Sequence, residues 1–174
     1  MMNTKIQKIT EADQECFVNM FNYYLYELSA YSLEDIGTNG TFEMDDTSPY
    51  YQDERLHPYF IKVNENLVGF ILITSPPYVA EGVDYSVQEL FVLPKYRGMN
   101  IAKEAAMRIF RLYPGRYDVG MFKSNAKAVK FWTNLLSSLN IAADVKEGVV
   151  EIAGNTLSTM ALTFVIQSEV DSHD

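Results

Sequence analysis

The segment best suited to chemistry is a short basic turn, Arg97 to Ala102, between a predicted strand and a predicted helix. A tight turn that enters a helix leaves several backbone N–H groups pointing outward at one place, and the helix dipole adds partial positive charge there. Arg97 contributes a full charge and a bidentate fork that suits phosphate oxygens. The segment therefore predicts a binding site for a phosphorylated cofactor.

The elements that position this turn are indicated by composition and spacing. Residues 83–93 form a β-branched and aromatic run that is typical of a buried strand, and Pro94 ends it. Apolar residues recur at helical spacing over residues 100–113. A further strand at 116–122 leads into a second helix at 125–139.

The rest of the chain completes a mixed fold. The pattern predicts a strand at 5–10, an amphipathic helix at 11–30 and a long polar loop at 31–53 with a short helix inside it. Two β-rich runs at 57–63 and 67–73, joined by the polar turn 64–66, then predict a hairpin. Two more strands follow near 145–152 and 157–166. Hairpins followed by strand–helix–strand units imply an α+β fold, in which helices cover both faces of a mostly antiparallel sheet of about six or seven strands.

The basic turn resembles motif A of the GCN5-related N-acetyltransferase (GNAT) family, which is usually written Q/R-x-x-G-x-G/A. Arg97 fits the first position and Ala102 the last, whereas Asn100 stands where the family normally has glycine. Asn tolerates left-handed backbone geometry better than other non-glycine residues, so the change is conservative in conformation.

A second stretch is similar to another cofactor segment of the same family, N-x-x-A-x-x-x-Y. Asn125 and Ala128 match it, and Trp132 holds the tyrosine position. The order of strand, turn, helix, strand and second helix is more specific than either motif, and it covers about residues 56–135.

The resemblance implies one N-acetyltransferase-like domain over residues 1–174, with acetyl-CoA as its co-substrate. We expect an acceptor-side helix and loop at 1–55, a cofactor-binding core at 56–139, C-terminal strands at 140–167 and a disordered tail at 168–174. The strand before motif A is expected to splay from the strand after its helix, with pantetheine in the gap. The cofactor-binding residues implied are Leu90, Phe91, Val92, Arg97, Gly98, Met99, Asn100, Ile101, Ala102, Asn125 and Ala128.

Glu89 is the candidate base for removing a proton from an amine acceptor. It lies in the middle of an apolar strand, where loss of contact with water would raise the pKa of its carboxyl. The competing interpretation is that strand alternation points Glu89 to solvent, or that it pairs with Arg97. Glu81 is a neighbouring acidic side chain that could serve at the acceptor side.

Two of the matched positions also have structural explanations. Trp132 cannot act as the acid that the family tyrosine provides, because an indole N–H donates a hydrogen bond but does not dissociate near neutral pH. Core packing is the alternative role for Trp132. Asn125 precedes a predicted helix, where asparagine is a favoured N-cap.

The first helix and the following loop carry a concentration of tyrosines interleaved with carboxylates. Tyr24, Tyr31 and acidic residues such as Glu27 could form a pocket that holds a cationic acceptor by ring faces and negative charge. The alternative is a helix that packs its aromatic stripe into the core, followed by a solvated loop.

Composition narrows the function classes. The net charge of −9 argues against a nucleic-acid partner, because phosphate binding needs a basic face, and it favours cationic ligands such as amines. No apolar run reaches membrane-spanning length. Cys16 is the only cysteine, and no cluster has the spacing of metal ligands, so we expect no metal and a cytoplasmic protein. The oligomeric state is left open, a homodimer included.

The leading hypothesis is an acetyl-CoA-dependent N-acetyltransferase, in which a small, cationic amine attacks the thioester directly in a ternary complex. Two alternatives stay open at this point. One is a non-catalytic acyl-CoA-binding or regulatory domain, which the replacements at Asn100 and Trp132 suggest. The other is a protein N-acetyltransferase, because nothing in the sequence separates a peptide groove from a small-molecule pocket.

Overall fold

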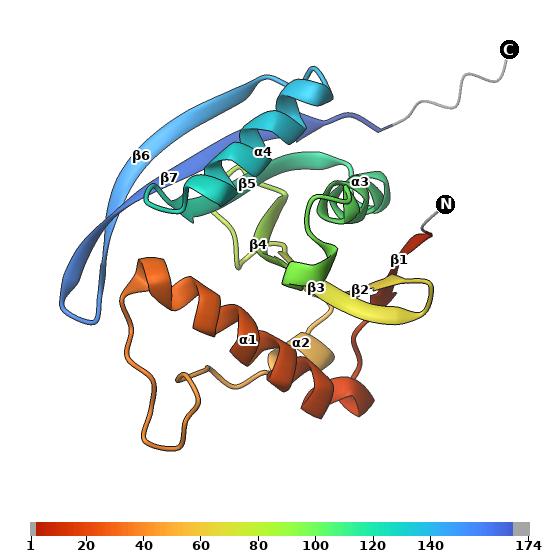
Figure 1. The fold of residues 1–174 in the computed structure, drawn as a ribbon. Coiled ribbons are helices and arrows are strands. Elements are labelled where there is room, and N and C mark those ends of the chain that lie inside the picture. The colour runs from red at the N-terminus through yellow and green to blue at the C-terminus, as the bar shows by residue number, and fades with distance from the viewer. Residues whose placement is uncertain (1–2, 169–174) are drawn as a thin grey trace, which may run out of the picture.

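A seven-stranded sheet forms the centre of the fold in the computed structural model, which describes residues 3–168 (Figure 1). The strand order is β1-β2-β3-β4-β5-β7-β6, and every neighbouring pair is antiparallel except β4 and β5. The strands are β1 (Thr4–Lys8), β2 (Leu56–Val63), β3 (Asn66–Thr74), β4 (Tyr85–Val92), β5 (Gly115–Phe122), β6 (Ala143–Ile152) and β7 (Asn155–Ile166). The predicted mixed, mostly antiparallel sheet is confirmed.

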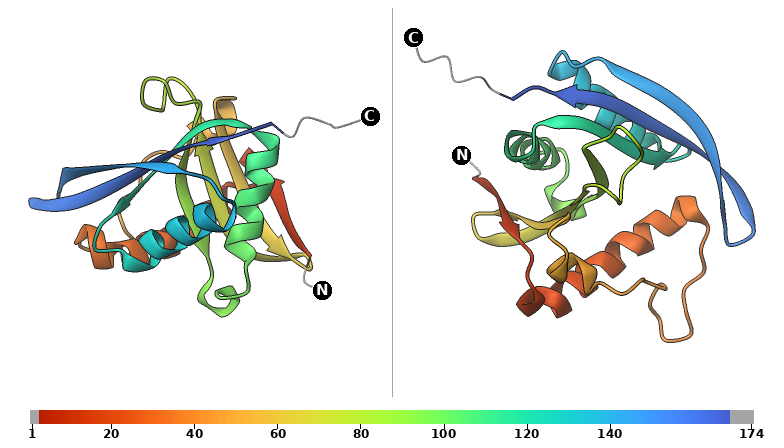
Figure 2. Two further views of the ribbon diagram at one scale, coloured as in Figure 1. Left: turned by 90° about the horizontal axis from the view of Figure 1, so that it is seen from above. Right: turned by 180° about the vertical axis from the view of Figure 1, so that it is seen from behind.

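Helices cover both faces of the sheet, as Figures 1 and 2 show. The long α1 (Gln14–Ser32) and the short α2 (Pro49–Gln52) lie on one side, and α3 (Ile101–Leu112) and α4 (Ala126–Ser138) lie on the other. Two 3₁₀ turns, η1 (Glu11–Asp13) and η2 (Pro94–Tyr96), precede α1 and α3. Among residues 3–168, no helix combines the length and the apolar composition needed to cross a bilayer.

Each face of the sheet has its own hydrophobic core. On the α1 side, Phe17 and Met20 pack against Phe60, Phe70 and Phe91 from the strands. On the other side, α3 and α4 bury the alternate residues of the same strands together with Trp132. This division follows from the alternation of side chains along a strand, which sends successive residues to opposite faces.

The predicted bounds differ from the observed ones by a few residues. The first helix, expected from residue 11, opens as a 3₁₀ turn, and the α-helix proper begins at Gln14. Thr10 is the N-cap residue of η1, as expected, and the Asp13 carboxylate accepts hydrogen bonds from its backbone N–H and its hydroxyl, at 2.9 and 3.0 Å. The predicted tail lies outside the described residues, except for Ser168.

The two parallel strands at the centre separate early. β4 and β5 pair only at Tyr85 with Tyr117 and at Ser86 with Asp118, so the remainder of each strand diverges from the other. The expected splay between these strands is therefore confirmed. It leaves one edge of β4 without a neighbouring strand from Val87 onward, in the part of the chain described.

Gly69 allows β3 to approach β4 closely, which leads to a stability prediction. A Cβ at this position would lie 2.0 Å from the Phe91 carbonyl oxygen, a backbone atom that cannot move aside cheaply. Gly69→Ala is therefore expected to lower the free energy of unfolding by about 3 kcal/mol, the upper part of the range for overpacking. Urea denaturation measures this change.

Gly120→Ala is the matched control for that prediction. Gly120 is also a strand glycine, but a Cβ there would meet nothing within 4 Å. We expect its free energy of unfolding to change by about 0.5 kcal/mol or less. Equal effects of the two substitutions would show that the approach of β3 to β4 is not tightly packed.

Candidate active site

A β-bulge in β4 places two polar side chains side by side. Leu72 of β3 pairs with Glu89, whereas the next residue, Ile73, pairs with Val87, so Gln88 is an extra residue without a partner on β3. A bulge interrupts the alternation of a strand, and bulges are common beside active sites. Gln88 and Glu89 consequently both interact with elements on the α1 side of the sheet.

Each of these two side chains accepts a hydrogen bond from a tyrosine hydroxyl. Tyr50 of α2 donates to the Gln88 side-chain oxygen at 2.7 Å. Tyr24 of α1 donates to a carboxylate oxygen of Glu89. The two helices that cover this face therefore fix the conformation of the bulge.

Glu89 is a partly buried carboxylate with a strongly shifted pKa. Burial raises the pKa of this carboxyl to about 7, and the hydrogen bond from Tyr24 opposes the shift. Glu89 thus neither points into solvent nor pairs with Arg97, so both simple alternatives for this residue are wrong. A carboxyl with a pKa near neutrality can accept a proton at physiological pH and release it again.

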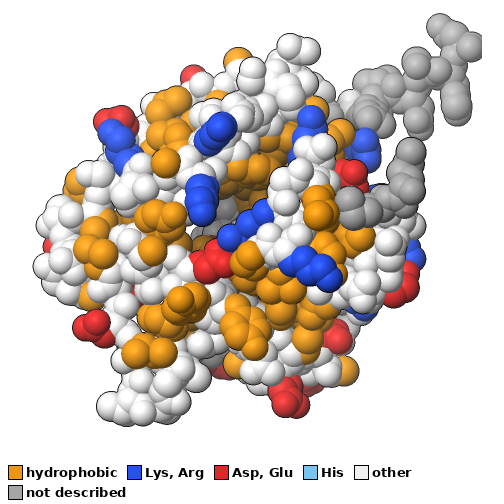
Figure 3. All heavy atoms as spheres, viewed as in Figure 1, with side chains coloured by type: hydrophobic (Ala, Val, Ile, Leu, Met, Phe, Trp, Pro, Cys, Tyr) orange, Lys and Arg blue, Asp and Glu red, His pale blue; other side chains and the backbone are white. Residues whose placement is uncertain are grey.

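A cavity of about 830 Å³ occupies the cleft between α1, β4 and the N-terminal ends of α3 and α4. Figure 3 shows a hollow near the middle of this face with several basic side chains around it. Of the residues expected to bind cofactor, Met99 does not line the cavity; its side chain is exposed. The others do: Leu90, Phe91, Val92, Arg97, Gly98, Asn100, Ile101, Ala102, Asn125 and Ala128.

The turn before α3 presents unpaired N–H groups to this cavity. Gly98 and Asn100 have φ values of +75° and +61°. Asn100 therefore adopts the left-handed backbone conformation that glycine normally provides. The first helical bond runs from the Glu104 N–H to the Asn100 carbonyl at 2.9 Å. The N–H groups of residues 101–103 precede this bond and have no helical acceptor, which makes this end of α3 suitable for an anion.

Arg97 lies at the edge of the cavity but is held by other protein groups. Its Nε donates to the Val92 carbonyl at 2.7 Å, and Nη2 donates to both carboxylate oxygens of Glu27 on α1, at 2.8 and 2.7 Å. Its guanidinium carbon also lies 5.8 Å from the centre of the Phe91 ring. The ion pair therefore links α1 to the turn before α3 across this cavity.

A second cavity of about 550 Å³ adjoins the first where β4 and β5 separate. Glu89 lines it, and so do residues of β5, β6 and β7, including Gly120, Glu147 and Met160. Tyr24 lines both cavities. Of the other residues expected at the acceptor, Tyr31 lines the larger cavity instead, and Glu81 is exposed between β3 and β4 and lines neither.

The two positions with structural alternatives keep those structural roles. The Asn125 side chain caps α4 by accepting from the Ala128 N–H at 3.1 Å. Trp132 is buried, with 5% of its surface exposed, and it packs in the core beside Phe131. Both residues also line the two cavities, so packing and contact with a ligand do not exclude each other.

Sequence reasoning missed the bulge at Gln88 and the partnership of Glu27 with Arg97. Glu27 stood out only as one of several acids in an aromatic segment, and its partner lies 70 positions along the chain. The bulge depends on register against β3, and the local pattern of β4 carries no glycine to mark it.

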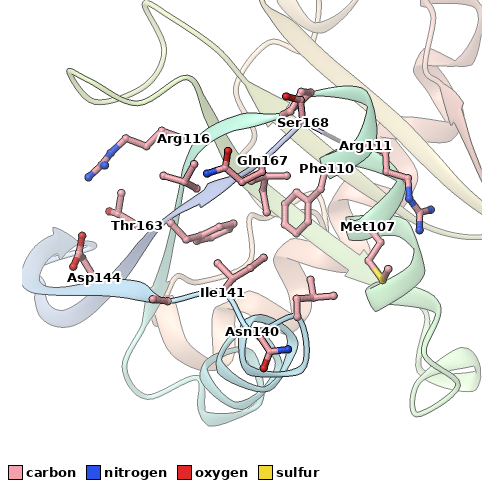
Figure 4. A pocket seen from close by; sticks show the side chains of 16 residues that line it. Met107, Phe110, Arg111, Arg116, Asn140, Ile141, Asp144, Thr163, Gln167 and Ser168 are labelled. Atoms are coloured by element: carbon pink, nitrogen blue, oxygen red, sulfur yellow. The ribbon is translucent and has the colours of Figure 1, made fainter. Parts of the chain in front are cut away.

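A third cavity, of about 840 Å³, lies away from this site, between the C-terminal ends of α3 and α4 and strands β6 and β7 (Figure 4). Arg111 and Arg116 lie on opposite sides of it and point outward. It shares no lining residue with the two adjoining cavities beside β4. Over residues 3–168, no three His, Cys, Asp or Glu side chains are grouped so that they could hold a metal ion.

The fold and the site together define an acetyltransferase. Residues 8–136 match the model of the Acetyltransferase (GNAT) family, and the chain belongs to this family. Membership makes acetyl-CoA the acetyl donor. A comparison with curated proteins finds no match.

Solved structures share the fold at low sequence identity. An N-acetyltransferase from Staphylococcus aureus Mu50 has a TM-score of 0.67 and 16% identity, covering 95% of this chain and 99% of that one. Spermidine N-acetyltransferase from Vibrio cholerae, in complex with CoA and spermine, has a TM-score of 0.65 and 15% identity, covering 94% and 95%. yncA from Salmonella typhimurium, with its cofactor acetyl-CoA, has a TM-score of 0.64 and 16% identity, covering 96% of each chain.

Proposed function

We propose that the protein transfers the acetyl group of acetyl-CoA to a primary amine of a small, cationic acceptor, with Glu89 as the general base. The observation that carries the proposal is the position of Glu89. Its carboxylate, with a pKa of about 7, lies on a bulge beside the junction of the two cavities.

The chemistry requires both substrates at once. CoA would occupy the larger cavity, with its pyrophosphate at the N–H groups before α3 and its thioester at the junction with the smaller cavity. The acceptor amine would enter from the smaller cavity and attack the thioester carbonyl carbon. Glu89 would take the proton that the nitrogen loses as the C–N bond forms and the C–S bond breaks.

Charge and size support a small cationic acceptor. The chain carries a net charge of −9, and the charged residues that line the smaller cavity are Glu89, Glu147 and Lys146. Glu147 is paired with Lys123 at 2.7 Å, which leaves Glu89 as the better candidate to face an ammonium group. The likeness to a spermidine N-acetyltransferase agrees with a polyamine acceptor.

The proposal is tested by supplying acetyl-CoA with three classes of acceptor and measuring the release of free CoA thiol. The acceptors are a linear polyamine, an amino alcohol of similar length with one amine, and a peptide with a free N-terminus. We expect turnover with the polyamine at the highest kcat/KM, because only the polyamine offers a second cation to a chain with a net charge of −9.

Two results would contradict the proposal in different ways. Tight CoA binding without turnover on any amine would indicate a non-catalytic acyl-CoA-binding domain. A kcat/KM for the peptide well above that for the polyamine would indicate a protein N-acetyltransferase.

A further inference from the structure

The mechanism above leaves the departing sulfur without a proton donor. The family tyrosine position holds Trp132, whose indole N–H does not dissociate near neutral pH. The thioester must lie where the two cavities meet, because acetyl transfer needs donor and acceptor together. The residues shared by both cavities are Tyr24, Leu28, Leu90, Asn125, Ala128 and Trp132. Among these, Tyr24 alone carries a proton that can be transferred.

The Tyr24 ring is held firmly by the aromatic core on the α1 side. It meets Phe70 and Phe91 in edge-to-face contacts at 5.8 and 6.0 Å between ring centres, and Phe21 at 5.7 Å. Its hydroxyl donates to the Glu89 carboxylate. A fixed hydroxyl therefore joins the general base to the junction where the sulfur would leave.

We propose that Tyr24 of α1 is the general acid of the reaction, donating its hydroxyl proton to the leaving CoA sulfur and regaining a proton from Glu89. This inference rests on the proposed function. It places the general acid on α1, because α4 has only the indole of Trp132 at the family tyrosine position.

The proton transfers balance for a neutral amine. The nitrogen attacks the carbonyl carbon, the C–S bond breaks, and one proton passes from nitrogen to the Glu89 carboxylate. Tyr24 gives its proton to the thiolate and takes the proton held by Glu89. The products are the acetamide and CoA thiol, and both side chains return to their starting states.

The electrostatics of the pair suit this exchange. Burial and the neighbouring Glu89 raise the pKa of Tyr24 well above its usual value, so the hydroxyl keeps its proton at physiological pH. Because the phenol is then a weak acid, the transfer to sulfur depends on the simultaneous return of a proton from Glu89. Direct contact between the two groups is what such a relay requires.

The test uses Tyr24→Phe, which keeps the packed ring and removes only the hydroxyl. We expect kcat to fall about tenfold, a modest loss for an acid because a thiolate leaves fairly well unaided. The KM for acetyl-CoA should change by no more than about twofold, since the hydroxyl is not proposed to bind acetyl-CoA before the reaction. The matched control is Tyr78→Phe, which removes a tyrosine hydroxyl that donates to Asp53 at 2.6 Å, outside both cavities.

A second readout does not depend on turnover. The pKa of the CoA thiol, followed by the ultraviolet absorbance of the thiolate in the protein complex, reports whether a hydroxyl faces the sulfur. In the wild type a hydrogen bond from Tyr24 would stabilise the thiolate. Tyr24→Phe should therefore raise the pKa of the CoA thiol, which corresponds to an acid dissociation constant about tenfold lower. Tyr78→Phe should leave it unchanged.

The outcomes separate this inference from the function on which it rests. An unchanged thiol pKa and kcat in Tyr24→Phe, with normal acetyl transfer by the wild type, would overturn the role of Tyr24 alone. No transfer by the wild type would overturn the proposed function and the acid with it. Loss of kcat together with a raised thiol pKa would support the relay.

Discussion

Glu89→Gln is expected to lower kcat/KM by about a thousandfold at pH 8, within the range found for loss of a general base. Glutamine keeps the shape and can still accept the hydrogen bond from Tyr24, but it cannot take a proton from the amine. In the wild type, kcat/KM should rise with pH through about 7, where Glu89 ionises, and then level off. The variant should lack this rise, which a pH profile of initial rates would measure.

The same variant should be no less stable than the wild type, which separates a chemical role from a structural one. The Glu89 pKa is raised from 4.5 to about 7 in the folded state, so the folded protein holds a proton that the unfolded chain has lost. Stability is therefore lost as pH rises from 4.5 to 7, and it stays lower above 7. Glu89→Gln should match the wild type below pH 4.5 and exceed its free energy of unfolding by up to about 3 kcal/mol above pH 7.

Glu54→Gln is a suitable control, since Glu54 is exposed and lines none of the cavities described here. Its rate and stability should remain near those of the wild type. If folded Glu89→Gln kept most of its activity, Glu89 could not be the base.

The elements around the site were predictable because their signals are local. The residue order in 83–102 marks a strand, a proline stop and a helix start, and the structure has β4, η2 and α3 there. Asn100 was expected to tolerate glycine-like geometry, and its φ of +61° confirms this. The position of Thr10 at the start of η1 was equally local, because its partner Asp13 lies three residues along the chain.

The contacts that decide the chemistry were not predictable from local patterns. The orientation of Glu89 depends on an unpaired residue in β4 opposite β3, and its partner Tyr24 comes from a helix 65 positions away. The sequence therefore left open whether Glu89 is a base, points to solvent or pairs with Arg97, and the contacts in the fold were needed to decide. The position of Tyr24 at the junction of both cavities likewise follows from how α1 crosses the sheet, which no spacing along the chain encodes.

Arg97→Ala is expected to raise the KM for acetyl-CoA roughly thirtyfold, because a charge-assisted hydrogen bond to phosphate contributes about 1.5 to 3 kcal/mol. The effect on kcat should be small, since the pyrophosphate is remote from the reacting carbon. Lys95→Ala removes a cation from the same segment, but Lys95 does not line the cavity and should leave the KM almost unchanged. Steady-state kinetics, or calorimetry with CoA, would measure the difference. Equal KM values for the two variants would show that Arg97 does not bind phosphate.

Glu27→Gln should act in the opposite direction, because Glu27 and the pyrophosphate would compete for the same guanidinium. The Glu27 and Arg97 side chains are 36% and 39% exposed, so their ion pair contributes little, about 0.2 to 1 kcal/mol. Its removal should therefore lower the KM for acetyl-CoA by at most about fivefold. In the Arg97→Ala background the same change should have no effect, because the shared partner is gone. A fall in KM that persisted without Arg97 would mean that Glu27 repels the cofactor directly and does not act through the ion pair.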